Sequence, residues 1–272
     1  MQTKSIKNNL IYVISVIYLM GLLFLGSVSA EETTQAHKNG ELVISNGTVY
    51  LIKDGKRFGF KTAEEFISHG YTFDMALTAN SWDLALPYAG EMTARDGSYV
   101  LDTSDGRTLY FIYQGVARPL AHSLFLTTLG LQGRSFFQID LSSYPKAQTT
   151  GFEYLYLSHP SGALIIKSGD STIFQVTDSG LRPFSAFSVF QSYRYDFSMV
   201  LSANLEDGKL PVLQPIEYRN GSLLNDKGTI FLVVDGKKYG FKTWESFVAR
   251  GYSLNAVIEG DTTGISEGES FQ

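Results

Sequence analysis

Apolar residues recur along the chain in short runs that are too brief for long helices and are separated by turn residues. The clearest stretch begins with apolar residues 42–44, followed by Asn46-Gly47, a strong hairpin signal. Residues 48–53 are rich in β-branched and aromatic side chains, as strands are. After Asp54-Gly55, a third run covers residues 57–60. This pattern predicts three short strands joined by two tight turns.

The period of the pattern then changes from that of a strand to that of a helix. Thr62 and Glu65 have the spacing of a capping box, in which each side chain accepts a hydrogen bond from the other residue's backbone N–H. Gly70 stands where helices commonly end, because glycine adopts the left-handed conformation there. We therefore expect a short helix between Thr62 and Gly70. The same pattern recurs between Thr243 and Gly251, although a serine replaces the glutamate.

The whole unit is written four times. Residues 49–56 return almost unchanged as 230–237, and 59–62 return as 240–243, while two weaker copies lie between. Aromatic residues at equivalent places are spaced 60, 64 and 57 residues apart: Tyr50, Tyr110, Phe174 and Phe231. Each copy opens with a glycine: Gly40, Gly97, Gly162 and Gly221. Such a small unit cannot bury its apolar face alone, so neighbouring copies must cover it.

The predicted fold is therefore mainly β with one short helix per unit, in four tandem repeats. A closed, propeller-like ring would leave no sheet edge open, whereas an open array of small barrels would need capping units at its ends. We favour the ring, because the polar ends of the chain show no capping units. The predicted divisions are a signal peptide 1–30, a linker 31–38, repeats at 39–90, 91–157, 158–215 and 216–259, and a flexible tail 260–272.

A family resemblance rests on the recurring residues of the first copy. They are Gly40-x-Leu42, Val49-Tyr50-Leu51-Ile52, Gly55-Lys56-Arg57, Phe60, Thr62, Phe66 and Gly70-Tyr71. The unit resembles a tandem repeat of exported bacterial surface and cell-wall-associated proteins. The middle copies keep the Arg-Pro element of that repeat, at Arg118-Pro119 and Arg182-Pro183. The resemblance covers nearly all of residues 39–258 and implies an accessory, non-catalytic role, but it brings no set of binding residues with it.

The N-terminus has the three-part pattern of a secretory signal. Lys4 and Lys7 form a positive region, residues 10–25 are nearly all apolar, and residues 28–30 are small, as a cleavage site requires. The alternative is an uncleaved membrane anchor, since a spanning helix needs about 20 apolar residues. We favour cleavage, which predicts a secreted or cell-surface protein that has no membrane contact once the signal is removed.

Composition and charge narrow the function classes. The 272 residues include no cysteine, which excludes disulfides, thiolate metal sites and a cysteine nucleophile. The 22 basic and 27 acidic residues give a net charge of −5. Removal of the signal takes away two basic residues, Lys4 and Lys7, and no acidic one, which leaves −7. This charge argues against a nucleic-acid partner, which needs a basic surface.

The sequence carries no recognisable catalytic or metal-binding motif. No two of the 4 histidines are spaced to bind zinc from one helix, and no Gly-x-Ser-x-Gly nucleophile elbow occurs. Asp102 and Asp105 have part of the spacing of a calcium loop, but an Asp-Gly hairpin turn explains them better. We therefore predict no catalytic residues, no metal and no cofactor.

The aromatic residues are the one enrichment that points to function. Most of the 19 Phe and 16 Tyr fall at recurring, core-like positions. Five aromatic residues break the repeat and are the predicted ligand-binding residues: Trp82, Tyr88, Tyr154, Tyr156 and Trp244. Flat aromatic faces serve sugar recognition and interfaces in general. Local packing is the alternative explanation for these five.

The leading functional hypothesis is an exported, non-catalytic binding or adhesion module that recognises a cell-wall or extracellular glycan, or a surface protein. The first alternative is an extracellular glycan hydrolase, which needs two carboxylates facing each other across a cleft. The second is a purely structural envelope component without a ligand.

Overall fold

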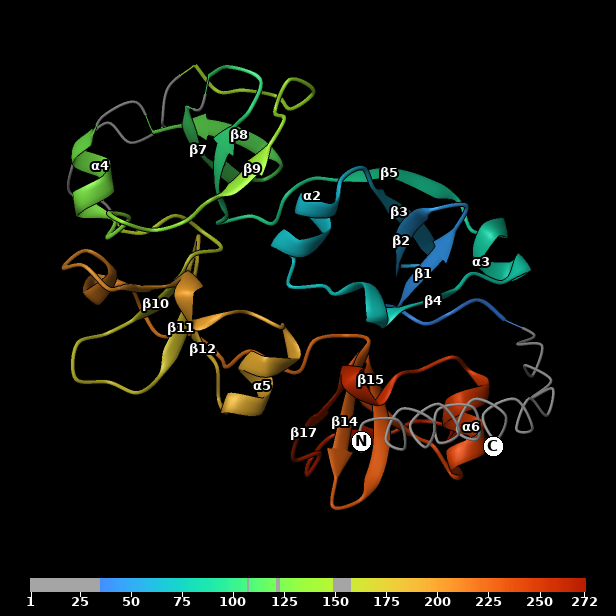
Figure 1. Ribbon diagram of the computed structural model, residues 1–272. Coiled ribbons are helices and arrows are strands. Elements are labelled where there is room, and N and C mark those ends of the chain that lie inside the picture. The colour runs from blue at the N-terminus through green and yellow to red at the C-terminus, as the bar shows by residue number, and fades with distance from the viewer. Residues whose placement is uncertain (1–34, 107, 121–122, 149–157) are drawn as a thin grey trace, which may run out of the picture.

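The computed structural model describes residues 35–272 except for residues 107, 121–122 and 149–157. Four small sheets lie at the corners of a rough square, one for each predicted repeat (Figure 1). Within the described part of the chain, no helix has the length and apolar character of a membrane span. The predicted signal peptide, residues 1–30, and the predicted binding residues Tyr154 and Tyr156 lie outside the described residues.

The first unit forms as its sequence pattern predicts. Strands β1 (Leu42–Ser45), β2 (Thr48–Lys53) and β3 (Lys56–Phe60) make an antiparallel meander. The two turns between them place Asn46 and Asp54 at positive φ, 49° and 52°, which suits hairpin turns of this length.

A capped helix follows the meander. Helix α2 (Ala63–Ser68) begins after Thr62, whose Oγ1 accepts from the Glu65 N–H at 3.1 Å. The Glu65 carboxylate accepts in return from the Thr62 N–H at 2.9 Å, so the predicted capping box is present. In the fourth unit Thr243 caps helix α6 (Trp244–Ala249) in the same way, with Ser246 as the donor.

Two short strands that the sequence analysis did not predict complete the first sheet. After the 3₁₀ turn η1 (Phe73–Met75), strand β4 (Ala76–Thr78) pairs parallel with β1. After helix α3 (Ser81–Ala85), strand β5 (Tyr88–Met92) pairs parallel with β3. The sheet order is therefore β4-β1-β2-β3-β5.

The other three units repeat this plan with small differences. The second contains β6 (Tyr99–Asp102), β7 (Leu109–Tyr113), β8 (Val116–Pro119), α4 (Ser123–Thr128) and β9 (Phe137–Ile139). The third contains β10 (Leu164–Ile166), β11 (Ile173–Thr177), β12 (Gly180–Pro183), α5 (Phe187–Ser192), η2 (Phe197–Met199), β13 (Val200–Ser202) and η3 (Asp207–Lys209). The fourth contains β14 (Ser222–Asp226), β15 (Thr229–Val234), β16 (Lys237–Gly240), α6, η4 (Leu254–Ala256), β17 (Val257–Glu259) and β18 (Ser266–Glu267). The prediction of a mainly β chain of four units, each with a short helix after its meander, is confirmed.

An aromatic pair recurs in the core of three units. A helix phenylalanine, 1–2% exposed, meets the edge of an aromatic ring from the third strand or from the residue just after it. The ring centroids are 5.2–5.3 Å apart and the planes 83–86° apart in Phe60–Phe66, Phe184–Phe190 and Phe241–Phe247. Edge-to-face contact is the favoured geometry for such pairs. The prediction of recurring core aromatics is confirmed for Phe60, Phe66 and Tyr71, whereas Tyr50 is half-buried.

Neighbouring units meet where their opening glycines lie backbone to backbone. A Cβ on Gly40 would lie 2.2 Å from the carbonyl carbon of Asn220, and one on Gly221 would lie 2.3 Å from the carbonyl oxygen of Gly40. The second contact of this kind joins the second and third units, since a Cβ on Gly97 would lie 2.1 Å from the carbonyl carbon of Gly162. Each interface therefore requires residues without side chains at its centre.

The chain also repeats on a larger scale, in halves of two units. The Arg95 N–H donates to Ser68 Oγ at 2.9 Å, and the Arg219 N–H donates to Ser192 Oγ at 3.1 Å. The Arg95 guanidinium lies 4.8 Å from the ring centre of Tyr195. The Arg219 guanidinium lies 3.6 Å from that of Tyr71, which stands 124 residues before Tyr195. The two halves thus contact each other through equivalent residues with exchanged roles.

The structure does not show the closed, propeller-like ring that the sequence analysis favoured, nor closed barrels. Among the described residues all four sheets are open, and no strand of one sheet pairs with a strand of another. The last unit does contact the first, through Gly40 and Gly221 and through the Tyr252 hydroxyl, which donates to the Glu41 carboxylate. The first and fourth units are joined by the backbone around Gly40 and Gly221 and by side chains such as Tyr252. The strands of the two sheets do not share a hydrogen-bond ladder.

The C-terminal segment 260–272, predicted to be a flexible tail, is part of the fourth sheet. Strand β18 pairs parallel with β16. Phe271 is 7% exposed, and its ring stacks on Phe241 with centroids 4.8 Å apart. Strand β18 is placed beside β16 as β5 is placed beside β3. The polar composition of the segment suggests a flexible tail, but the single buried ring of Phe271 holds it against the fourth unit.

We predict that Gly40→Ala lowers the free energy of unfolding by about 2–4 kcal/mol, because it adds the cost of a left-handed alanine to that of a steric clash. Gly47→Ala is the matched control, since Gly47 has a similar φ (79° against 88°) but no atom within 4 Å of its Cβ position. We expect about 1–2 kcal/mol for the control. Urea denaturation of both variants measures the difference, and equal losses would show that the close approach is unimportant.

Candidate functional site

The described members of the predicted aromatic set are all on the surface but lie on separate elements. Trp82 in α3, Tyr88 in β5 and Trp244 in α6 are 54%, 52% and 52% exposed. Tyr88 meets Tyr50 edge-on at 6.4 Å, and Trp244 stacks on Phe247 at 5.2 Å. The Arg57 guanidinium also lies 5.6 Å from the centre of the Tyr88 ring. About half of each of these three residues is therefore open to a partner.

An apolar groove, about 490 Å³ in volume, lies between the first and third units. Three of its lining residues are large and half-exposed: Ile67 (45%), Phe187 (56%) and Phe197 (60%). The Phe187 and Phe197 rings are nearly parallel, 12° apart, with centroids 5.8 Å apart. Tyr71 and Phe190, which are 4% and 2% exposed, form its base. None of the predicted residues Trp82, Tyr88 and Trp244 lines this groove.

Arg194 contributes to the groove from a conformation that costs energy. It follows helix α5 at φ 54°, in the place that glycine occupies after the other helices: Gly70, Gly130 and Gly251. A left-handed residue with a side chain is disfavoured by about 1–2 kcal/mol relative to glycine. The Arg194 guanidinium donates to the carbonyl oxygen of Ala256 in the fourth unit, so the side chain ties the third unit to the fourth.

A signal for this groove was present in the sequence. Trp244 was selected because it stands where the first unit has Ala63, at the first position of the helix. Phe187 occupies that same position in the third unit. Alignment of all four helices, and not of the two best copies alone, would have identified Phe187 as a second exposed aromatic at this position.

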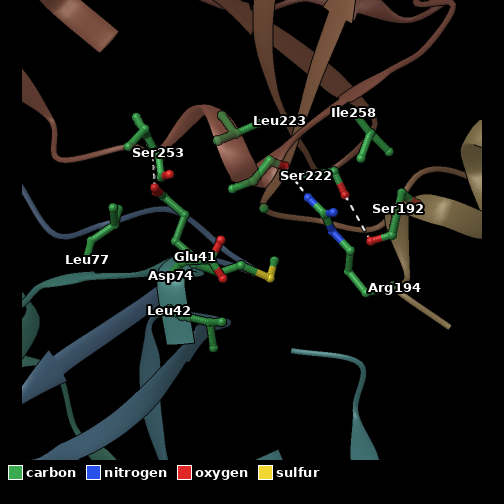
Figure 2. Close-up of a pocket in the computed structure, with 15 residues that line it drawn as sticks. Glu41, Leu42, Asp74, Leu77, Ser192, Arg194, Ser222, Leu223, Ser253 and Ile258 are labelled. Atoms are coloured by element: carbon green, nitrogen blue, oxygen red, sulfur yellow. Dashed lines mark hydrogen bonds between the residues drawn. The ribbon is translucent and has the colours of Figure 1, made fainter. Parts of the chain in front are cut away.

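A narrower pocket lies where the first, third and fourth units meet (Figure 2). Glu41 and Asp74 enter it from the first unit, Arg194 from the third, and Ser222 and Leu223 from the fourth. Glu41 and Asp74 thus place two carboxylates in the same concavity, which is the arrangement that a glycan hydrolase would require.

The chemistry of this pocket is mostly satisfied within the protein. The Glu41 carboxylate, 5% exposed, accepts from the Lys38 N–H at 2.5 Å and from the Tyr252 hydroxyl. Burial and the adjacent Glu41 charge raise the pKa of Tyr252 well above its usual value, so Tyr252 remains a donor. The pocket holds only about 30 Å³, which is room for one or two water molecules. A sugar ring does not fit.

Two His–Asp pairs recur at equivalent places in the two halves. The backbone N–H and Nδ1 of His37 each lie 2.7 Å from an Asp83 carboxylate oxygen, and His159 and Asp207 repeat both distances. Asn80 caps α3, and the Asp83 carboxylate accepts from the Asn80 N–H; the Asp207 carboxylate accepts from the Asn204 N–H in the same way. The first pair holds the segment before the first unit to helix α3, and the second holds the segment before the third unit to the 3₁₀ turn η3.

The His159 pair is enclosed, whereas the His37 pair is near the surface. The second ring nitrogen of His159 lies 3.3 Å from the carbonyl oxygen of Leu129, and its side chain is fully buried. The His37 side chain is 11% exposed. Burial lowers the pKa of His37, but the hydrogen bond with Asp83 and the charges of Glu41 and Asp83 outweigh it, so this pKa is raised.

The Asp102–Asp105 segment forms a turn, as the sequence predicts. Asp102 accepts from the backbone N–H groups of Ser104 and Leu141 and pairs with Lys146 at 2.5 Å. Burial acts against ionisation, yet these donors lower the pKa of Asp102 to about 2. Across the described residues, no group of three or more histidines and carboxylates is arranged to hold a metal ion.

Comparison with known proteins gives only distant similarity. No family model and no curated protein sequence matches the chain. Among solved structures, the chain is similar to one titled as the periplasmic assembly from the ESX-5 inner membrane complex, with 11% identity and a TM-score of 0.20 over 88% of this chain and 68% of that one. It is also similar to the EccB3 dimer from the ESX-3 core complex, with 12% identity and a TM-score of 0.16 over 85% of this chain and 98% of that one. At these TM-scores the chains do not superpose as whole folds.

We predict that the His37–Asp83 pair makes stability depend on pH. Because the folded pKa of His37 is raised, its contribution is fully present below the ordinary value of 6.5 and is lost as the pH rises through the folded pKa. Because the folded pKa of Asp83 is lowered, its contribution is present above 3.8 and is lost as the pH falls through the folded pKa. The pair is therefore most stabilising between these limits.

Urea denaturation between pH 5 and pH 9 tests this prediction, with His37→Gln as the comparison. We expect the native chain to lose more stability than the variant on the alkaline side of pH 6.5. Parallel pH profiles of the two proteins would contradict it.

Proposed function

We propose that the chain is an exported, non-catalytic binding module of a bacterial envelope, and that the groove between the first and third units receives an apolar segment of another protein. The observation that carries this proposal is the gathering of Ile67, Phe187 and Phe197, all half-exposed, in one groove. Export follows from the N-terminal signal pattern, and the accessory role from the resemblance of the repeat.

The exposure of these side chains is costly unless a partner covers them. Burial of apolar surface contributes about 25 cal/mol per Å², and exposed apolar clusters with polar edges are typical of interaction sites. Gln191, Arg194 and Asp196 supply the polar edge. The lining thus has the apolar centre and polar rim of a protein interface.

The exposed side chains of the groove favour a protein over a glycan. Ile67, Phe187 and Phe197 have no hydrogen-bonding atom in their side chains, so an apolar segment of a protein would cover them more completely than a polar sugar would. The glycan hypothesis depends instead on Trp82, Tyr88 and Trp244, which are exposed on separate elements. It remains the second candidate, because aromatic rings of this kind can each stack on a sugar of an extended polymer.

Two observations weigh against the hydrolase alternative. The pocket that contains Glu41 and Asp74 is about 30 Å³. The Glu41 carboxylate is already bound by two donors from the protein. A structural component without a ligand is the remaining alternative, and it would leave the exposed groove unexplained.

We predict that peptides selected from a displayed random library on residues 31–272 bind in this groove. Phe197→Ser should weaken the best peptide by about tenfold or more, since truncation of an exposed aromatic anchor typically costs 2 kcal/mol or more in binding. Isothermal titration measures the affinity. Trp244→Ser is the matched control, because Trp244 is similarly exposed but lies outside the groove.

Sedimentation with insoluble peptidoglycan separates the two candidates. The protein version expects no retention. Retention that is lost in a Trp82→Ala, Tyr88→Ala, Trp244→Ala triple variant but kept in Phe197→Ser would overturn it in favour of the glycan. Equal peptide binding by Phe197→Ser and the native chain would also contradict the groove as the contact surface.

A further inference from the structure

A second concave space, partly open to solvent, lies at the other glycine interface, between the second and third units. Its volume is about 310 Å³, at the small end of the range for ligand sites. One part of its wall is apolar and includes Leu131, Phe137, Leu164 and Met199. Among the described residues that line it, none is acidic.

Two buried polar atoms in this wall have no hydrogen-bond partner among the residues that the structure describes. They are the hydroxyl oxygens of Ser98 and Tyr99, which follow the opening glycine of the second unit. Ser98 as a whole is only 3% exposed. A buried hydroxyl without a partner is destabilising, and in native proteins it calls for an explanation such as a ligand or a bound water molecule. Burial raises the pKa of Tyr99 far above its usual value, so its hydroxyl is a donor.

Two arginines give the space a positive charge. Arg95 donates to the carbonyl oxygens of Ser68 and Gly162, and Arg134 donates to those of Gly130, Ser198 and Val200. Within the described part of the chain, neither guanidinium forms an ion pair with a carboxylate. Uncompensated charge in a partly desolvated wall favours an anion in the space beside it.

The pocket in Figure 2 is the counterpart of this cavity in the other half of the chain. Two polar residues of that pocket have apolar residues in their place in the cavity. Glu41 follows Gly40, whereas Ala163 follows Gly162. Tyr252 follows Gly251, whereas Leu131 follows Gly130.

In the pocket of Figure 2, the Tyr252 hydroxyl donates to the Glu41 carboxylate, and a volume of only about 30 Å³ is left. In the counterpart cavity both groups are replaced by apolar residues. The tyrosine hydroxyl comes instead from Tyr99, which stands where the fourth unit has Leu223. The charge of Asp207 acts on it, but no group among the described residues forms a hydrogen bond with it.

We propose that the cavity between the second and third units binds a small amphipathic carboxylate, whose anionic group takes the place that Glu41 fills in the related pocket. The Tyr99 and Ser98 hydroxyls donate to the carboxylate, the charges of Arg95 and Arg134 stabilise it, and the apolar wall receives the hydrocarbon body. Met199 is the one lining residue that this cavity shares with the proposed protein-binding groove. The side chains that carry the two proposals are different, so either can fail without the other.

Octanoate is the probe, and octanol is its neutral control. Titration of each into residues 31–272, followed by isothermal calorimetry and by the thermal midpoint, should show octanoate binding at least tenfold more tightly than octanol. Tyr99→Phe keeps the packing and removes one hydrogen bond to the anion, so it should weaken octanoate roughly tenfold. In the absence of probe, Tyr99→Phe should be as stable as the native chain or more stable, because the hydroxyl it removes has no partner.

Ala163→Glu supplies the carboxylate from within the chain and should abolish octanoate binding in a protein that still folds. Glu41→Gln is the matched change in the other pocket and should leave octanoate binding unaltered. No binding of octanoate by the native chain, equal binding of octanoate and octanol, or unchanged binding by Tyr99→Phe would each overturn the proposal. A cavity that holds only water would give the first of these results.

Discussion

The close approach of two backbones at each glycine pair is the constraint on which the rest of the structure depends. Gly40 with Gly221, and Gly97 with Gly162, set the separation of their units to a distance at which no Cβ fits. The Arg95 and Arg219 side chains, the Figure 2 pocket and the larger cavity all lie around these contacts. A small sheet of this size cannot bury both faces alone, so the interfaces determine what is core and what is surface.

Local signals in the sequence were sufficient for the units but not for their assembly. The Asp-Gly turns, the Thr62–Glu65 capping box and the recurring aromatics predict the meander and helix that the structure shows. The parallel strands after the helices were missed, because three-residue strands such as Ala76–Thr78 have no period to detect. The closed, propeller-like ring is not what the structure shows. The hydrophobic pattern of a strand indicates which face is buried, but it does not indicate whether the edge of its sheet pairs with the sheet of the next unit.

The functional surfaces were predicted less well, for a related reason. Trp82, Tyr88 and Trp244 break the repeat, and they are exposed as such residues should be. The groove leaves no such signal, because Ile67 and Phe197 come from units far apart in the sequence and only the packing of the first unit on the third brings them together. The His37–Asp83 and His159–Asp207 pairs leave none either, because their partners are 46 and 48 residues apart.

The equivalence of the two halves has a consequence for how such a chain can evolve. A symmetric dimer of identical halves would carry the same sequence at both interfaces, so a change that opened one pocket would open the other and weaken both contacts together. Fusion of the halves into one chain removes this coupling. Position 41 can keep a carboxylate that closes one interface while position 163 loses it, and stability and ligand specificity can then be selected at different places in the same architecture.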